Sequence, residues 1–295
     1  MRFASYLAST VFAVTALAST AALAGPINVG PGGSIVTDEF SWETPTVQLG
    51  QQLQGVVEVN AINAPAAAVN PVYTTGSGGQ FLSAVFGGFT LVSLSQTAPD
   101  ASGNSTFHLA YTGGFINYYT SPTNPFSNLA ILNTATALTD ATNAVTSGTP
   151  WLGFTAETIG ACAITDTGCV GGITLQITGT QQGLGLTNVS SSGTSTVFLD
   201  LVNGFGLSGI IQQNTYINPW LNQLADATYT GHASSIQCAS HGITPTSQGG
   251  LSPFQICGSN DLATQIIPEP FTLSLFGAGL AGVAAIRRRK AKKAA

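Results

Sequence analysis

The chain has 295 residues, of which 44% are hydrophobic and only 6% are charged. This hydrophobic content allows a buried core and argues against a fully disordered chain. Arg2 and the C-terminal stretch 287–293 hold all 7 basic residues, so no Lys or Arg lies between residues 3 and 286. Binding a nucleic-acid backbone or clamping a phosphate requires such side chains, so the composition disfavours both classes of function.

The N-terminus has the pattern of a secretory signal peptide. Arg2 gives a basic start, residues 3–18 are apolar apart from Ser and Thr, and Ala22-Leu23-Ala24 supplies a small-x-small cleavage pattern before Gly25. We therefore expect residues 1–24 to form a signal helix that signal peptidase removes. The mature protein would then enter an oxidising compartment.

Residues 25–267 are predicted to be mainly β, because apolar and polar side chains alternate in several short runs. These runs are 53–60, 107–112, 173–178 and 197–201. Asn203-Gly204 lies between two apolar runs, as is typical of a hairpin turn. Short strands with Gly-rich turns and no fixed repeat predict one antiparallel β-sandwich domain of jelly-roll type.

Signals for helix are few in this domain. Asn218-Pro219-Trp220-Leu221 has a capping residue and a proline that could start one short helical turn. Residues 129–145 are ambiguous, because their apolar residues fit neither the helical nor the strand period and their Thr residues weaken a helix.

The acidic residues form one local cluster, made of Asp38, Glu39 and Glu43. Calcium would accept these carboxylates together with backbone carbonyl oxygens, which makes the cluster a candidate metal site. A solvated loop is the simpler interpretation. A glycosidase pair cannot be chosen from the sequence, because the separation of two carboxylates in space decides it.

The even number of cysteines predicts disulfides in an exported chain. Four cysteines allow three connectivities, of which the local one, Cys162 with Cys169 and Cys238 with Cys257, is preferred. The competing interpretation is a zinc site in which His232 and His241 join Cys238 and Cys257, although this spacing matches no known finger pattern.

The C-terminus contains three features in a fixed order. Pro268-Glu269-Pro270 is followed by residues 271–286, which carry no charge, and then by Arg287-Arg288-Arg289-Lys290. At about 1.5 Å per residue such a helix spans about 24 Å, and snorkelling basic side chains would help it to reach across a ~30 Å hydrocarbon core. The basic cluster should stay cytoplasmic, which places the bulk of the chain outside. Residues 268–295 are therefore predicted to form a transmembrane sorting helix.

This tail resembles the PEP-CTERM sorting signal of Gram-negative bacteria. The residues that carry the resemblance are Pro268, Glu269, Pro270, Arg287, Arg288 and Arg289. It implies recognition by an exosortase, a membrane enzyme that would cut near Pro-Glu-Pro and pass the protein to the surface. It also implies a stay in the inner membrane before processing and an association with exopolysaccharide.

Two segments of the middle part, 113–119 and 225–229, resemble the ectodomain of flocculation-associated PEP-CTERM proteins. The resemblance implies a role in floc or biofilm formation. PEP-CTERM tails also occur under an ice-binding label, but the Thr-x-Thr triplets of this chain have irregular spacing. Irregular spacing argues against a flat ice-facing array.

The favoured hypothesis is a non-enzymatic, exported protein of the exopolysaccharide layer, with no cofactor other than calcium. Exposed aromatic side chains could stack on sugars, and the candidates are Tyr118, Tyr119, Trp151 and Trp220. For each of them a core position is the simpler interpretation, because aromatic side chains dominate cores. The alternative is an extracellular polysaccharide hydrolase. No Gly-x-Ser-x-Gly nucleophile elbow occurs in the chain.

Overall fold

A computed structural model describes residues 33–46, 48–63, 71–158, 172–182, 192–203, 216–218, 223–244 and 250–266. The strands are β1 (Gly33–Glu43), β2 (Gln52–Asn63), β3 (Tyr73–Thr74), β4 (Phe81–Gln96), β5 (Asn104–Thr112), β6 (Phe115–Ser121), β7 (Thr149–Ala156), β8 (Leu175–Gln182), β9 (Ser192–Asn203), β10 (Tyr216–Asn218), β11 (Gln223–Ala225), β12 (Ala227–Ser234) and β13 (Ile256–Ile266). The helices are η1 (Ser77–Gly79), η2 (Leu129–Asn133), α1 (Ala137–Thr146) and α2 (Ser235–Ser240).

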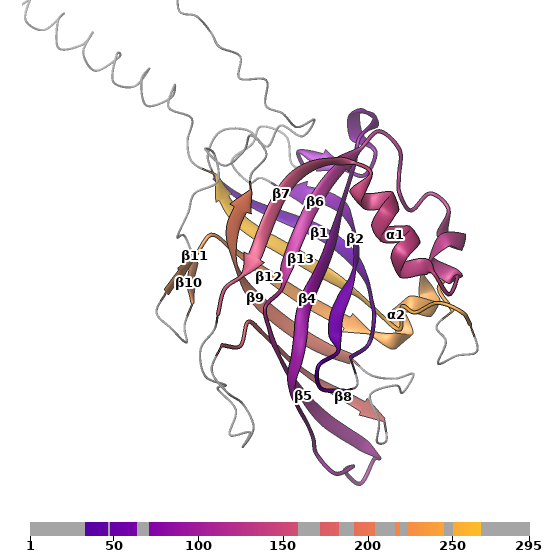
Figure 1. Ribbon diagram of the computed structural model, residues 1–295, viewed down its shortest axis with the longest axis vertical. Helices are drawn as coiled ribbons and strands as arrows, with labels where there is room; N and C mark the ends of the chain where they lie inside the picture. The colour runs from indigo at the N-terminus through magenta and orange to yellow at the C-terminus, as the bar shows by residue number, and fades with distance from the viewer. Residues whose placement is uncertain are drawn as a thin grey trace, which may run out of the picture.

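The main sheet closes on itself as an antiparallel barrel of 8 strands (Figure 1). The ring runs β1–β2–β4–β6–β7–β9–β12–β13, and β13 pairs with β1 to complete it. Each of these strands pairs with the next along the chain, so the connectivity is up-and-down. Closure pairs the backbone groups that an open sheet would leave at its edges.

The ring forks at β5 and β6, which form one line interrupted at Gly113 and Gly114. β4 pairs with both, but β6 then pairs with β7 while β5 pairs with β8. Both glycines have positive φ, as does Gly88 on β4 opposite them, which a residue with a side chain would adopt only with strain. Thr174 closes the fork, because its N–H donates to the Tyr111 carbonyl at 2.9 Å.

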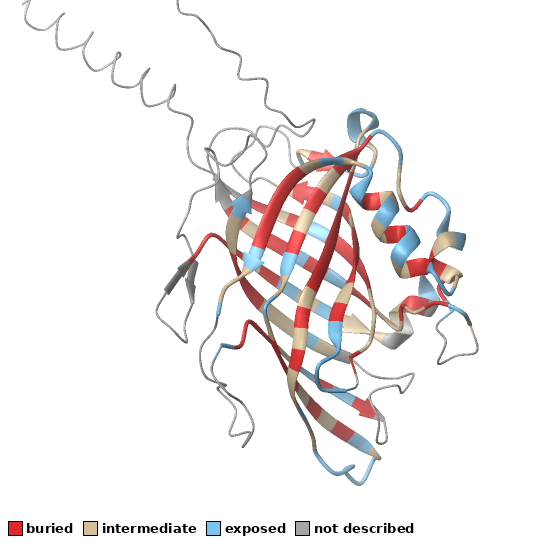
Figure 2. Cartoon of the chain, in the orientation of Figure 1, coloured by how far each residue is buried: buried red, intermediate tan, exposed pale blue. Residues whose placement is uncertain are grey.

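Alternate side chains of the strands point into the barrel, and the burial pattern follows this alternation (Figure 2). The interior is filled mainly by aliphatic and aromatic side chains. Its largest fully buried members include Trp151, Tyr111, Tyr118, Phe154, Ile62 and Leu82.

A second core lies on the outside of the barrel, where η2, α1 and α2 cover β1, β2, β4 and β13 (Figure 1). Ala137, Ala141 and Val145 are fully buried and recur every four residues, which gives α1 one apolar face. Packing of this face against Val56 and Val85 explains why the ambiguous stretch 129–145 is helical despite its Thr residues.

The predicted β-rich class is confirmed, but the predicted sandwich is wrong, because the described strands close into a barrel. Alternation shows which side chains are buried, and both architectures bury one face of each strand. Three of the four predicted strand runs lie within β2, β5 and β9, and the run 173–178 overlaps β8 from Leu175 onward. Gly204, Pro219 and Trp220 lie outside the described residues, as do the segments 1–24 and 268–295 for which a signal helix and a sorting helix were predicted.

Candidate functional site

A hollow occupies the end of the barrel where β1 ends and β13 begins. Its empty space is about 630 Å³, counted with its open mouth. A second hollow of about 400 Å³ continues deeper into the barrel and shares several lining residues with the first. The shared residues are Glu43, Leu53, Ile177, Ser195 and Asn260. An eight-stranded barrel is just wide enough to be filled by side chains or to hold one small ligand.

The two sides of this hollow differ in polarity. Glu43, Ser195, Tyr229 and Asn260 lie on β1, β9, β12 and β13. Apolar side chains come mainly from β2, β4, β5, β6 and β8, and these are Leu53, Phe86, Phe89, Phe107, Leu109, Ile116, Leu175 and Ile177. The hollow therefore has a polar wall and an apolar wall.

Glu43 ends a short chain of hydrogen bonds on the polar wall. The Asn260 amide donates to the Ser41 hydroxyl at 2.6 Å, and that hydroxyl donates to the Glu43 carboxylate at 2.7 Å. Burial raises the pKa of Glu43 to about 7, and the Ser41 hydrogen bond offsets part of this rise. Glu43 therefore changes charge near neutral pH.

Glu39 lies on the same inward face of β1 and is 1% exposed. Its Oε1 accepts hydrogen bonds from the Thr37 hydroxyl at 2.6 Å and the Tyr118 hydroxyl at 2.9 Å. Burial raises the pKa of Glu39 to about 7, although these donors favour the charged form. The Tyr229 hydroxyl also faces this carboxylate and, like the other two donors, lowers the pKa of Glu39.

The structure separates the acidic cluster that the sequence singled out as a candidate calcium site. Asp38 is exposed on the outside of the barrel, whereas Glu39 is enclosed and Glu43 lines the hollow. Neighbouring residues of a strand point to opposite faces, so proximity in sequence does not bring these carboxylates together. Within the described ranges, no three His, Cys, Asp or Glu side chains gather where a metal ion would bind.

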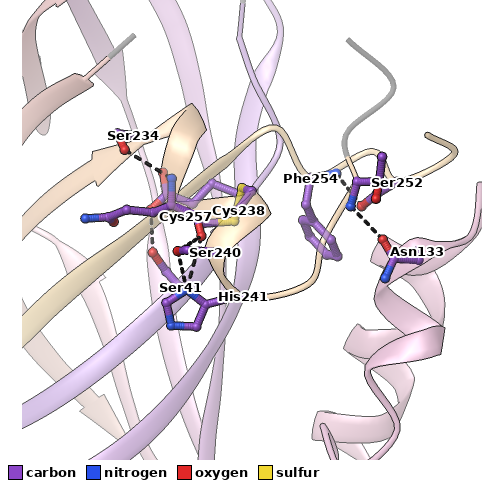
Figure 3. The surroundings of a disulfide bond; sticks show 12 residues. Ser41, Asn133, Ser234, Cys238, Ser240, His241, Ser252, Phe254 and Cys257 are labelled. Carbon is purple, nitrogen blue, oxygen red and sulfur yellow. Dashed lines mark hydrogen bonds between the residues drawn. A yellow bond between two sulfur atoms is a disulfide. The ribbon is translucent and has the colours of Figure 1, made fainter. Parts of the chain in front are cut away.

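Cys238 and Cys257 form a disulfide that ties α2 to β13 (Figure 3). This confirms one predicted pair and contradicts the zinc alternative, because disulfide sulfurs are not thiolate ligands. His241 instead stacks on Phe40, with ring centroids 3.8 Å apart. Cys162 and Cys169 lie outside the described residues.

Two of the proposed sugar-stacking residues are core residues. Tyr118 and Trp151 are 0% and 2% exposed, so neither presents a ring to a polysaccharide. Tyr119 is half-buried beside the outer core, and Trp220 lies outside the described residues.

Asn260, Ser195 and Tyr229 are site residues that the sequence analysis missed. The signal that could have found part of the site is the polar stripe Thr37, Glu39, Ser41 and Glu43, which occupies every second position of β1. Alternation of this kind on an enclosed strand face marks a polar patch inside the core.

The C-terminal residues 267–290 match the model of the PEP-CTERM protein-sorting motif. This match defines an exported, cell-surface protein that is anchored at its C-terminus. The motif implies processing by an exosortase. Comparisons with curated proteins and with solved structures found no match. In the part of the chain that the structure describes, no helix has the length and apolar character needed to cross a membrane.

Proposed function

We propose that this protein is a non-enzymatic component of the exopolysaccharide layer that helps cells to adhere or flocculate. The sorting motif carries the proposal, since it delivers the chain to the cell surface. The resemblance of residues 113–119 and 225–229 to flocculation-associated proteins supports the same role.

The hydrolase alternative requires two carboxylates that face one cleft. Glu43 lines the hollow, whereas Glu39 is enclosed and is not among the lining residues of either hollow described above. This arrangement favours the non-enzymatic role. Incubating matrix polysaccharide with the purified protein should therefore leave the chain length of the polysaccharide unchanged.

Retention in the matrix has to occur without basic side chains. Residues 25–267 contain 11 carboxylates, which are the 12 of the whole chain minus Glu269, and no Lys or Arg. An acidic polysaccharide would repel such a domain at low ionic strength. Calcium bridging or short-range hydrogen bonds to neutral sugars would overcome this repulsion.

We expect a calcium chelator to increase the fraction of protein released from washed cells. We expect cells that lack the protein to settle more slowly, and the full chain to restore settling. Sodium chloride at matched ionic strength is the control for screening. If the chelator does not change the release of the protein, calcium bridging is ruled out. If loss of the protein does not change the rate of settling, the proposed role is contradicted.

Replacement of Arg287, Arg288 and Arg289 by Gln should impair sorting, because the basic cluster fixes the orientation of the tail in the membrane. The expected result is accumulation of unprocessed chain in the membrane fraction and loss of mature protein from the surface. Mass spectrometry of wild-type surface protein should find no peptide beyond the Pro-Glu-Pro region. Recovery of an intact Ala295 terminus from surface material would contradict cleavage.

A further inference from the structure

The hollow in the barrel has a composition that selects one class of small molecule. Its apolar wall offers Leu53, Phe89, Leu109 and Ile177 to a hydrocarbon or aromatic body. Removal of such apolar surface from water lowers the free energy, so a ligand that covers it binds favourably. A purely apolar ligand would leave the polar wall without partners, which is costly in a buried site.

The polar wall presents a carboxylate to the hollow. Glu43 lines both parts of the hollow, together with Ser195 and Asn260. Buried polar groups in proteins are nearly always hydrogen-bonded, so a ligand that fills the hollow has to offer a donor to this carboxylate. Tyr229 lines the deeper part, where its hydroxyl interacts with the enclosed Glu39.

The charge of the site decides which polar groups it accepts. Ser41 donates one hydrogen bond to Glu43, and an ionised carboxylate has room to accept several more. No Lys or Arg lies between residues 3 and 286, so a ligand carboxylate would meet Glu43 with no counter-charge from such a side chain. The site therefore favours donors and rejects anions.

We propose that the barrel binds one small amphipathic molecule, whose apolar body lies against the β2, β4, β5 and β8 wall. Its head group is a protonated amine or an alcohol that donates a hydrogen bond to Glu43 and lies beside Asn260. Fatty acids and other anionic amphiphiles are excluded. This binding is independent of the role in the exopolysaccharide layer.

Three ten-carbon ligands that differ only in the head group provide the test. Calorimetric titration of the exported protein at slightly alkaline pH, below the concentration at which the ligands aggregate, should detect binding of decylamine and decanol. Decanoate should bind at least about tenfold more weakly than decylamine. The ammonium of decylamine makes a charge-assisted hydrogen bond to Glu43, whereas the carboxylate of decanoate is repelled by it. Absence of binding by the amine and the alcohol, or equal binding of decanoate, would overturn the proposal.

Glu43→Gln keeps the shape of the side chain and removes its charge. This substitution should weaken the binding of decylamine about tenfold and leave the binding of decanol nearly unchanged, since an amide oxygen still accepts a neutral hydrogen bond. Asp261→Asn is the matched control, because it removes the same charge at an exposed position beside Asn260 on β13. Decylamine affinity that is unchanged in Glu43→Gln, or reduced equally in Asp261→Asn, would place the head group elsewhere.

Discussion

Raising the pH from about 5 to about 8 should lower the free energy of unfolding of this protein by about 2.5 kcal/mol through Glu39 alone. Burial raises the pKa of Glu39 from 4.5 to about 7. Between these two values the folded protein keeps a proton that the unfolded chain has released. Stability therefore falls as the pH rises through this window and levels off above the folded pKa. Glu43, whose pKa is also raised to about 7, adds to the same slope.

Glu39→Gln should remove the contribution of this residue to the slope. The amide oxygen can still accept the hydrogen bonds from Thr37 and Tyr118, but the side chain no longer carries a buried charge at high pH. We expect the variant to be about 3 kcal/mol more stable than wild type near pH 8 and only about 1 kcal/mol more stable near pH 5.

Urea unfolding of the exported protein at both pH values measures this difference. Asp38→Asn is the matched control, because Asp38 is the preceding residue of β1 and is exposed outside the barrel. The control should keep the wild-type slope. A Glu39→Gln protein whose stability falls with pH as steeply as that of wild type would show that Glu39 is not the titrating group.

Gly114→Ala should destabilise the barrel by about 3 to 5 kcal/mol, combining backbone strain with overpacking. Gly114 has φ of 115°, a conformation that side chains disfavour. A methyl group at this position would also overlap the ring of Phe89, which is buried and packs against the glycine. The interruption between β5 and β6 therefore depends on the absence of a side chain at Gly114.

Gly103→Ala separates the two causes. Gly103 has φ of 80°, but a methyl group there would meet nothing within 4 Å. We expect it to cost only about 1 to 2 kcal/mol, from strain alone. Thermal and urea unfolding of both variants provide the measurement. Equal losses in the two variants would contradict a steric role of Phe89.

The β-rich class was predictable from alternation in β2, β5, β8 and β9, because a strand with one enclosed face must alternate. Closure of the sheet into a barrel was not predictable, because it depends on which strands become neighbours. The pairing of β1 with β13 joins segments more than 200 residues apart, as in the Gly33–Ile266 pair. Local sequence patterns do not predict a pairing over such a distance in the sequence.

The candidate site was only partly predictable for a similar reason. Glu39 and Glu43 were singled out as a cluster, but their strand carries Asp38 to the opposite face. Tyr229 and Asn260 come from β12 and β13, and only the closed ring brings them beside β1. Tyr118 and Trp151 were candidates for sugar stacking, but a core position was the simpler interpretation, and the structure places both in the core.

The pairing of Gly33 with Ile266 also fixes where the barrel is tethered. The chain leaves the barrel at Ile266, and the sorting motif begins at the next residue. The hollow lies at the other end of β13, beside Ile256 and Asn260. The barrel is therefore joined to its C-terminal sorting motif at the end opposite the mouth of the hollow, so the motif and the mouth are separated by the length of β13.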